Sequence, residues 1–497
     1  MAKYKPYDYN QLIMIPVSLE AQLIPGTLEH TIHMVVENEI DISIFDEKYN
    51  NDETGCKAYN PKILLKSILL GYARGKIGSR KIEQACRENI IFMALTCGKT
   101  PDHSTIAAFV TSMGEETLFI FQKVLLICDR LGLLGGTCFA VDGCKLPGNA
   151  SKEWSGTFDE LQKKQEKLKE RLSEMLQEHI VTDQKEYSNE KQEKKADDLK
   201  KQIEKIETFL KENEPKPGKK KKENKSNITD NDSHLMRTSH GVIQGYNAQA
   251  MVDSEHQIIV HADAGDSGQD DEHLPMMIEG LKENLKAIGK SEKVLQEAVI
   301  LGDANYNSPT NLTTCVKDDL NAYFPDKNFR KTDPRQKQTN TRFSMKDFIF
   351  NEKEDNYTCP AQKTLIRKSD IKRNGQKYYR SYVAQELDCQ ACSYRKRCLT
   401  KKQSKRRYLS VMYAKEVAEY AQNMNAKFNT VEGRKIYDQR IVIDEPVFAN
   451  LRIQKRLDKF VLRGKNKVNI QWILYCIVHN LEKLANNGYQ RACLNVA

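Results

Sequence analysis

The sequence lacks any long run of apolar residues. No stretch approaches the roughly 18–20 consecutive apolar residues that a membrane-spanning helix requires, so we expect no integral membrane protein. The first residues, MAKYKPYDYNQ, also lack the apolar core of a signal peptide. We therefore expect a cytoplasmic protein.

The sequence also has little that indicates disulfide bonding. It contains 13 cysteines, but without a secretory signal we do not expect a disulfide framework. Most cysteines stand singly in apolar runs, which is typical of small core residues. Four others are grouped between residues 359 and 398 and require another explanation.

A strong overall charge is missing too. The net charge is only +10, from 78 basic and 68 acidic residues. The basic residues are concentrated in 363–407 and 434–467, whereas 253–279 is acidic. This asymmetry favours a polyanionic partner such as nucleic acid. The alternative is a lysine-rich surface that is simply solvated.

A chain of 497 residues is too long for one ordinary core, so we expect two to four domains. Residues 1–130 are predicted to be all-helical, with Pro61 in a first helical turn and Ser104 or Thr105 as a helix cap. Short helices joined by tight turns are typical of helix-turn-helix modules, and equally of any small helical bundle.

Residues 158–213 are almost entirely charged or amide residues. Apolar side chains recur at heptad spacing in two groups, which predicts an antiparallel helical hairpin with a solvated charged surface. The segment 215–232 is predicted to be a flexible linker. The heptad positions are Leu161, Leu168 and Met175, then Ile203 and Leu210.

The remaining apolar runs predict a mixed sheet with flanking helices. Strands are predicted near 137–145, 245–253, 257–265, 298–303 and 321–325, with an amphipathic helix at 271–289 and a long helix near residue 445. This α+β or α/β order matches the ribonuclease H-like fold, in which strand ends carry the chemistry.

Three carboxylates in this order suggest a two-metal site. Asp142 ends the run TCFAV, Asp303 ends EAVILG, and Glu445 lies in a basic helical stretch. Two Mg²⁺ ions about 4 Å apart, held by few carboxylates, can drive in-line phosphoryl transfer. Singly, each Asp is more typical of a turn, and Glu445 of a surface ion pair. Rival carboxylates are Asp253, Asp263 and Asp266.

Tyr437, Arg440 and Arg452 accompany Glu445 at helical spacing. An arginine beside a catalytic carboxylate can hold a phosphate with two hydrogen bonds. Tyr437 can hydrogen-bond a phosphate or stack on a base; its alternative role is a packed aromatic residue.

The four grouped cysteines predict a structural Zn²⁺ site. Cys389 and Cys392 form a Cys-x2-Cys pair, which places two thiolates on one turn, and Cys359 and Cys398 complete four ligands. The alternative is a set of free thiols in an insertion loop.

These motifs resemble those of the DDE transposases of bacterial insertion sequences. VDGCKLPGNAS is similar to the first-Asp motif, with Cys144 where the family usually has Thr, and LGDANYNSP to the second. The stretch from Tyr437 to Arg452 resembles the Tyr-Arg-Glu-Lys signature, with Arg452 in place of Lys. EPVFANLR, FVLRGKNKV and WILYCIVHNLEKL also follow the pattern of insertion-sequence family eleven-eighty-two.

The resemblance implies an enzyme with Asp142, Asp303 and Glu445 as catalytic Mg²⁺ (or Mn²⁺) ligands and with Tyr437, Arg440 and Arg452 contacting DNA. It implies cleavage and strand transfer by a homodimer on terminal inverted repeats and target DNA, associated with the nucleoid. The alternatives are a related nuclease without strand transfer and an inactive DNA-binding derivative. We expect these parts: 1–130, a helical end-binding domain; 131–157 and 236–325, the catalytic domain; 158–235, the hairpin and linker insertion; 326–410, the basic zinc insertion; and 411–497, C-terminal helices with the catalytic Glu.

Overall fold

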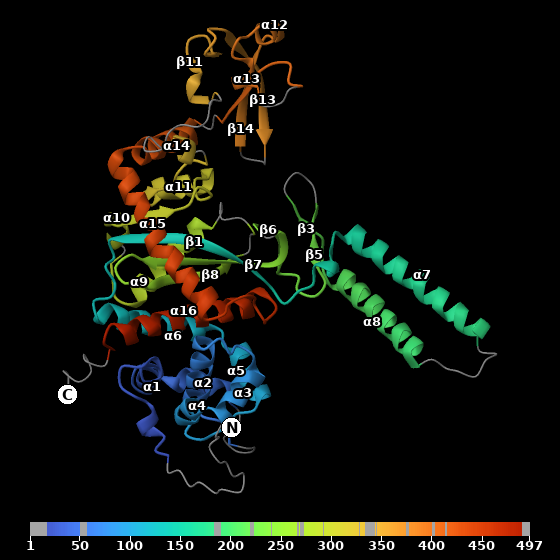
Figure 1. The fold of residues 1–497 in the computed structure, drawn as a ribbon, viewed down its shortest axis with the longest axis vertical. Coiled ribbons are helices and arrows are strands. Elements are labelled where there is room, and N and C mark those ends of the chain that lie inside the picture. The colour runs from blue at the N-terminus through green and yellow to red at the C-terminus, as the bar shows by residue number, and fades with distance from the viewer. Residues whose placement is uncertain are drawn as a thin grey trace, which may run out of the picture. The chain divides into compact units, whose positions relative to one another are not determined.

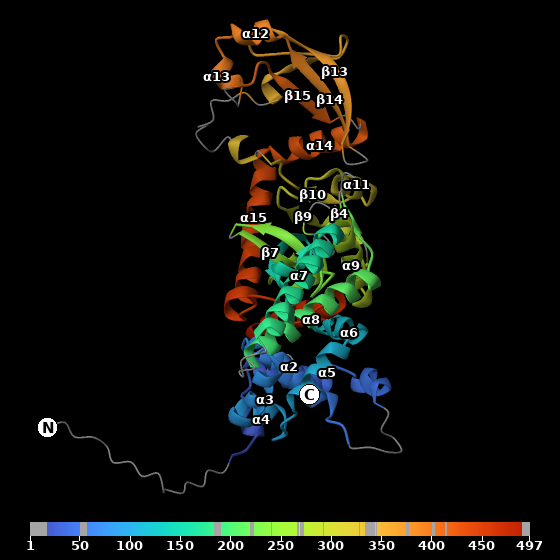
Figure 2. The ribbon, with the colours of Figure 1, turned by 90° about the vertical axis from the view of Figure 1, so that its right-hand side faces the viewer.

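The computed structural model is a mixed helix and sheet protein that divides into two compact units (Figures 1 and 2). It describes residues 17–489 apart from 50–56, 183–189, 219–222, 240, 266–267, 269–272, 292, 328, 333–342, 344, 374–376, 400–402 and 413–414. The first unit combines 1–133 with 450–457 and 470–497, and the second combines 134–449 with 458–469.

The first unit is helical, as the sequence predicts. Asn60 caps the helix that begins at Pro61. The prediction that Ser104 or Thr105 caps a helix was wrong. Asp102 caps the helix that begins at His103 and accepts hydrogen bonds from the backbone amides of Ser104 and Thr105. The elements are η1 (Glu20–Gln22), α1 (Leu28–Asn38), η2 (Ile42–Lys48), α2 (Pro61–Ala73), α3 (Ser79–Glu88), α4 (Ile90–Leu95), α5 (His103–Ser112), α6 (Glu115–Arg130), the short π-helix η8 (Asn450–Gln454) and most of α16 (Lys465–Asn486).

The second unit is built on a six-stranded mixed sheet. Its order is β10-β9-β1-β7-β6, and β8 also pairs with β7. β7 is antiparallel to β1, β6 and β8, whereas β9 is parallel to β1 and β10 is parallel to β9. The strands are β1 (Cys138–Pro147), β6 (His234–Thr238), β7 (Gly241–Asp253), β8 (Ile259–Gly265), β9 (Val299–Gly302) and β10 (Asn321–Tyr323).

Helix α15 (Val431–Ala449) contacts three strands of this sheet, β1, β7 and β9 (Figure 1). Pro446 lies inside α15 and has no amide hydrogen for the carbonyl of Val442. The side-chain amide of Gln257 donates to that carbonyl at 2.8 Å. The helix therefore continues through the proline. Other helices of this unit are α9 (Leu274–Ala287), α10 (Lys293–Glu297), α11 (Pro309–Lys317) and α14 (Lys415–Phe428).

The charged segment forms the predicted helical pair, α7 (Phe158–Thr182) with α8 (Glu190–Glu212). The prediction of a linker after it was wrong in part, because short strands pair there and the buried Asp230 accepts a hydrogen bond from Tyr246. The short elements are η3 (Lys152–Trp154), β2 (Ser155–Gly156), β3 (Lys216–Pro217), β4 (Glu223–Asn224) and β5 (Ser226–Asn227).

A second, five-stranded antiparallel sheet follows in the order β11-β12-β13-β14-β15. One face covers its own core, formed by Phe348, Tyr357, Leu365, Tyr382, Ala384 and Leu409. The elements are η6 (Phe329–Thr332), η7 (Met345–Asp347), β11 (Ile349–Asn351), β12 (Asn356–Thr358), β13 (Thr364–Arg373), β14 (Lys377–Ala384), α12 (Glu386–Gln390), α13 (Arg395–Cys398) and β15 (Tyr408–Met412).

Within the described residues, every helix is too short or too polar to cross a membrane.

Candidate functional site

Asp142 lies on β1, and Asp303 directly follows the adjacent parallel strand β9 of the main sheet. Val141 pairs with Gly302, and the residue after each of them is an aspartate, so the two aspartates lie at the same level. The Asp142 carboxylate accepts from the Gly143 amide at 2.8 Å, and the Asp303 carboxylate accepts from the Asn305 amide at 2.8 Å. The fold therefore brings together two carboxylates that are 161 positions apart in the sequence.

Helix α15 brings Arg440 and Asp444 to Asp142. The guanidinium Nη1 of Arg440 donates to Asp142 Oδ2 at 3.1 Å and to Asp444 Oδ2 at 2.6 Å. Asp444 is completely buried, and its Oδ1 has no hydrogen-bond partner among the described residues. One arginine thus joins a carboxylate of the sheet to a carboxylate of the helix.

Glu445 follows Asp444 directly and is exposed. Successive residues of a helix point about 100° apart, so the two side chains leave α15 in different directions. Arg440 forms an ion pair with Asp444, which is four residues later on the helix, and not with Glu445, which is five residues later. Asp444 is not among the residues predicted from the sequence. The signal in the sequence that could have indicated Asp444 was its position four residues after Arg440.

Tyr437 and Arg452 occupy contrasting environments. Tyr437 is buried and makes edge-on contacts with Phe329 and Phe428, as a packed aromatic residue does. Arg452 is exposed on the π-helix Asn450–Gln454, in the first unit.

Burial raises the pKa of the Asp142 carboxyl to about 6, and Arg440 opposes this shift. Burial, together with the charge of Asp142, raises the pKa of Asp444 to about 7. Burial is the largest cause of both upward pKa shifts, and the charge of Asp303 adds to the shift of Asp142. Arg440 opposes both shifts but does not cancel them. A site with this balance favours an additional cation.

Buried polar side chains lie beside the residues that follow Asp142 and Asp303 along the chain. A Cβ at Gly143 would lie 2.0 Å from the side-chain amide nitrogen of Gln249, so a larger residue beside Asp142 would have to displace the Gln249 side chain. The hydroxyl of Tyr306 donates to the side-chain oxygen of the same Gln249. Both Gln249 and Tyr306 are fully buried. The loop after Asp303 is thereby tied to strand β7.

The rival carboxylates lie elsewhere. Asp253 accepts from the amides of Gly135, Gly136 and Glu255, which is the expected turn role. Asp142 pairs with Ala250. Asp263 pairs with Gln249, and Gln249 pairs with Gly143, so these three residues form one row across the sheet. Neighbouring positions along a strand face opposite sides of the sheet, so Asp263 faces away from Asp142. Asp266 lies outside the described residues.

Replacing Asp142 with Asn is expected to raise the melting temperature of the metal-free protein at pH 7.5. A folded-state pKa of about 6 lies above the ordinary 3.8, so the charged carboxylate costs stability above about pH 6 and nothing below about pH 4. We expect a gain of about 1–2 kcal/mol at pH 7.5 that vanishes toward pH 4. Thermal unfolding at both pH values tests this. An equal gain at both would contradict it.

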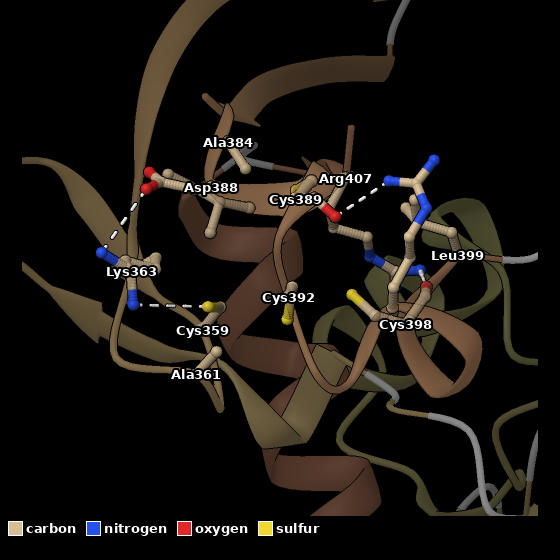
Figure 3. A pocket seen from close by; sticks show the side chains of 12 residues that line it. Cys359, Ala361, Lys363, Ala384, Asp388, Cys389, Cys392, Cys398, Leu399 and Arg407 are labelled. Atoms are coloured by element: carbon tan, nitrogen blue, oxygen red, sulfur yellow. Dashed lines mark hydrogen bonds and ion pairs between the residues drawn. The ribbon is translucent and has the colours of Figure 1, made fainter. Parts of the chain in front are cut away.

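The four grouped cysteines line one pocket beside the second sheet (Figure 3). Cys359 Sγ accepts from the backbone amide of Lys363 at 3.4 Å. Burial and the neighbouring Cys389, Cys359 and Cys392 raise the pKa of Cys398, although Arg407 opposes this. As they stand, no three His, Cys, Asp or Glu side chains within the described residues meet as a ready metal cluster.

Two parts of the chain match known protein families. Residues 358–485 match a family described as a transposase DDE domain, and residues 17–112 match a transposase domain of the DUF772 type. No curated protein matches the chain. The two matches support a DDE transposase of an insertion element.

Proposed function

We propose that this protein cuts and joins DNA as the transposase of an insertion sequence of family eleven-eighty-two type. The observation that carries the proposal is the pairing of β1 with β9, which sets Asp142 and Asp303 side by side under helix α15. The sheet order β8-β7-β1-β9-β10, antiparallel on one side of β1 and parallel on the other, supports a ribonuclease H-like catalytic domain.

In this proposal Asp142, Asp303 and Glu445 hold Mg²⁺ or Mn²⁺. The donors fit, because Mg²⁺ prefers carboxylate oxygens, and the raised pKa values of Asp142 and Asp444 show that Arg440 alone does not offset the burial of these carboxylates. When bound, two such ions activate the attacking oxygen and stabilise the leaving oxygen. The exposed position of Glu445 leaves its carboxylate accessible to solvent and ions.

Arg440 is proposed to bind the reacting phosphate, and Asp444 to hold the Arg440 side chain in place. The short Arg440–Asp444 contact fixes one edge of the guanidinium. A guanidinium held in place beside the carboxylates is suited to a phosphate oxygen. Tyr437 supports Arg440 from the preceding turn, and Arg452 contacts DNA from its exposed position.

The proposed reaction has two in-line displacements. The oxygen of a water molecule attacks the phosphorus at the end of the element, and the bond to the 3′ oxygen breaks, which releases a 3′-hydroxyl. That hydroxyl then attacks a phosphorus of the target DNA and displaces the target's own 3′ oxygen. The water and the hydroxyl each lose a proton, and each leaving oxygen gains one. Because the attacking groups are a water and a DNA hydroxyl, no covalent protein–DNA intermediate forms.

The other parts supply binding. The helices of residues 1–130, which include the match over 17–112, are proposed to bind the terminal inverted repeats. Two ends are processed together, so the active form is proposed to be a homodimer on DNA. The cysteine pocket is proposed to hold a structural Zn²⁺, because four thiolates form a complete tetrahedral ligand set.

A strand-transfer assay separates this proposal from a plain nuclease. With Mg²⁺, pre-cut ends that carry a free 3′-hydroxyl are expected to join to a supercoiled plasmid, because the second displacement needs no prior cut. Ends blocked with a 3′-deoxy nucleotide are the matched control and give no joined product. Cutting of uncut ends without any joining of pre-cut ends would favour the nuclease, and neither reaction would favour an inactive derivative.

A further inference from the structure

The positive charge of the chain is concentrated in one small sheet. Residues 349–412, here called the cysteine module, contain 16 basic and 6 acidic residues, a net charge of +10. The rest of the chain keeps 62 basic and 62 acidic residues and is neutral. The module therefore carries the entire net charge of the protein.

Among the described residues, part of this charge lies on a folded platform. The five strands β11–β15 cover a buried core, and Cys359, Cys389 and Cys398 of the cysteine pocket pack against that core (Figures 1 and 3). Side chains on such a sheet keep fixed spacings, unlike those of a charged tail, so they can present a defined surface to a partner.

Part of the charge is used inside the module. Arg395 donates to the carbonyl oxygens of Cys389 and Ser404, and Arg407 donates to that of Cys398. Arg367 pairs with Asp355 and Asp370. These arginines hold the cysteine loop and the strand ends in place.

The outer face of the sheet is different. Ile366 pairs with Val383, and Val383 pairs with Tyr408, so these three residues form one row on the side away from the core. Ile366 is 54% exposed and Tyr408 is 48% exposed. Two cations lie beside the Tyr408 ring: Lys368 Nζ at 5.7 Å and the Arg406 guanidinium carbon at 5.5 Å from its centre.

We propose that this outer face, formed by Ile366, Lys368, Arg406 and Tyr408, is a DNA-binding surface that contacts the phosphate backbone. Cations beside an exposed aromatic ring match a chain of phosphates carrying sugars and bases. The choice of DNA as the polyanion rests on the proposed function. The surface would then add a contact to DNA beyond those of the end-binding helices and the catalytic carboxylates.

Charge reversal tests this surface. Lys368→Glu with Arg406→Glu in the full chain is expected to weaken binding to a labelled duplex at least about tenfold. It should lower the slope of log affinity against log salt by about 2, because two cations no longer neutralise phosphates. Fluorescence anisotropy over a salt series, without divalent metal, measures both quantities. A single strand of about 40 nucleotides, run in parallel, shows which form of DNA the face prefers.

Two further variants keep the test sharp. Lys368→Arg with Arg406→Lys retains the charge and should bind as the parent does. Lys194→Glu with Lys195→Glu makes the same change of charge on exposed residues of α8 and should weaken binding less than about twofold. If the reversal on the module has no more effect than that on α8, the surface does not bind DNA. The binding assay needs no cleavage. Strand transfer can therefore fail while this surface still binds DNA, and this surface can fail to bind DNA while strand transfer still occurs.

Discussion

Asp142→Ala and Asp303→Ala are each expected to abolish Mg²⁺-dependent cleavage and strand transfer while the protein still binds the element's ends. Each removes one of the carboxylates that the pairing of β1 with β9 sets side by side. Loss of groups that stabilise transition-state charge typically costs about 10²–10³-fold or more in rate. Gel assays with labelled ends measure cleavage, and anisotropy in the absence of Mg²⁺ measures binding.

The neighbouring acids of α15 give the sharper comparison. Glu445→Ala is expected to lose activity as completely as the two aspartate variants, because it removes a metal ligand. Asp444→Asn is expected to lose about 10–100-fold in cleavage rate, as changes behind a site typically do, because Arg440 loses one of its two charged partners. Near-normal cleavage by folded Glu445→Ala together with complete loss in Asp444→Ala would transfer the ligand role to Asp444.

Asp263→Ala is the matched control for these variants. It removes a carboxylate from the same sheet, but on the row of Gly143 and Gln249, which faces away from Asp142. We expect its cleavage rate to stay within a few-fold of the parent's. A loss as large as that of Asp142→Ala would mean that Asp263 belongs to the site.

The two sheet carboxylates were predictable because each ends a short apolar run. A buried strand needs such a run, and Asp303 directly follows β9, as that pattern predicts. Asp142 does not end its strand, because β1 continues past it to Pro147 in pairing with β7. That the two aspartates lie side by side depends on β9 lying parallel beside β1. Only the resemblance to a known family indicated this, since no local signal specifies which strands pair.

The choice between Asp444 and Glu445 was not predictable in the same way. It depends on the rotation of α15 about its axis. The buried residues of that helix include Gly433, Arg434, Tyr437, Ile443, Asp444 and Val447, which do not form a single apolar stripe. Asp444 is a charged residue on the buried side of a helix, where an apolar residue is usual. Its contact with Arg440 explains this position.

The segment 215–232 shows a different limit. Its lysines, glycine and prolines are typical of a linker, and the short strands β3–β5 are too brief to show any periodicity. What orders it is tertiary. The buried carboxylate of Asp230 accepts from the Tyr246 hydroxyl at 2.8 Å and from the Gly464 amide at 3.1 Å, both distant in sequence.

Cys389→Ser is expected to reduce bound zinc from about one ion per chain to nearly none and to loosen the cysteine module. The four cysteines line one pocket, yet they come from the turn after β12 and from the loop between β14 and β15. A tetrahedral ion would join these two segments. It would also relieve the burial and mutual repulsion that raise the pKa of Cys398. Without it, the thiols have only weak interactions to hold them.

Elemental analysis of protein purified without chelators measures the metal, and limited proteolysis measures the order of the module. Cys97→Ser is the matched control, because Cys97 is a single exposed cysteine and should leave both readings unchanged. Adding a chelator to the parent protein should reproduce the proteolysis pattern of Cys389→Ser, since metal and fold are coupled at structural sites. Protein that contains no zinc, and whose module resists protease equally with and without chelator, would show that these four thiols are free.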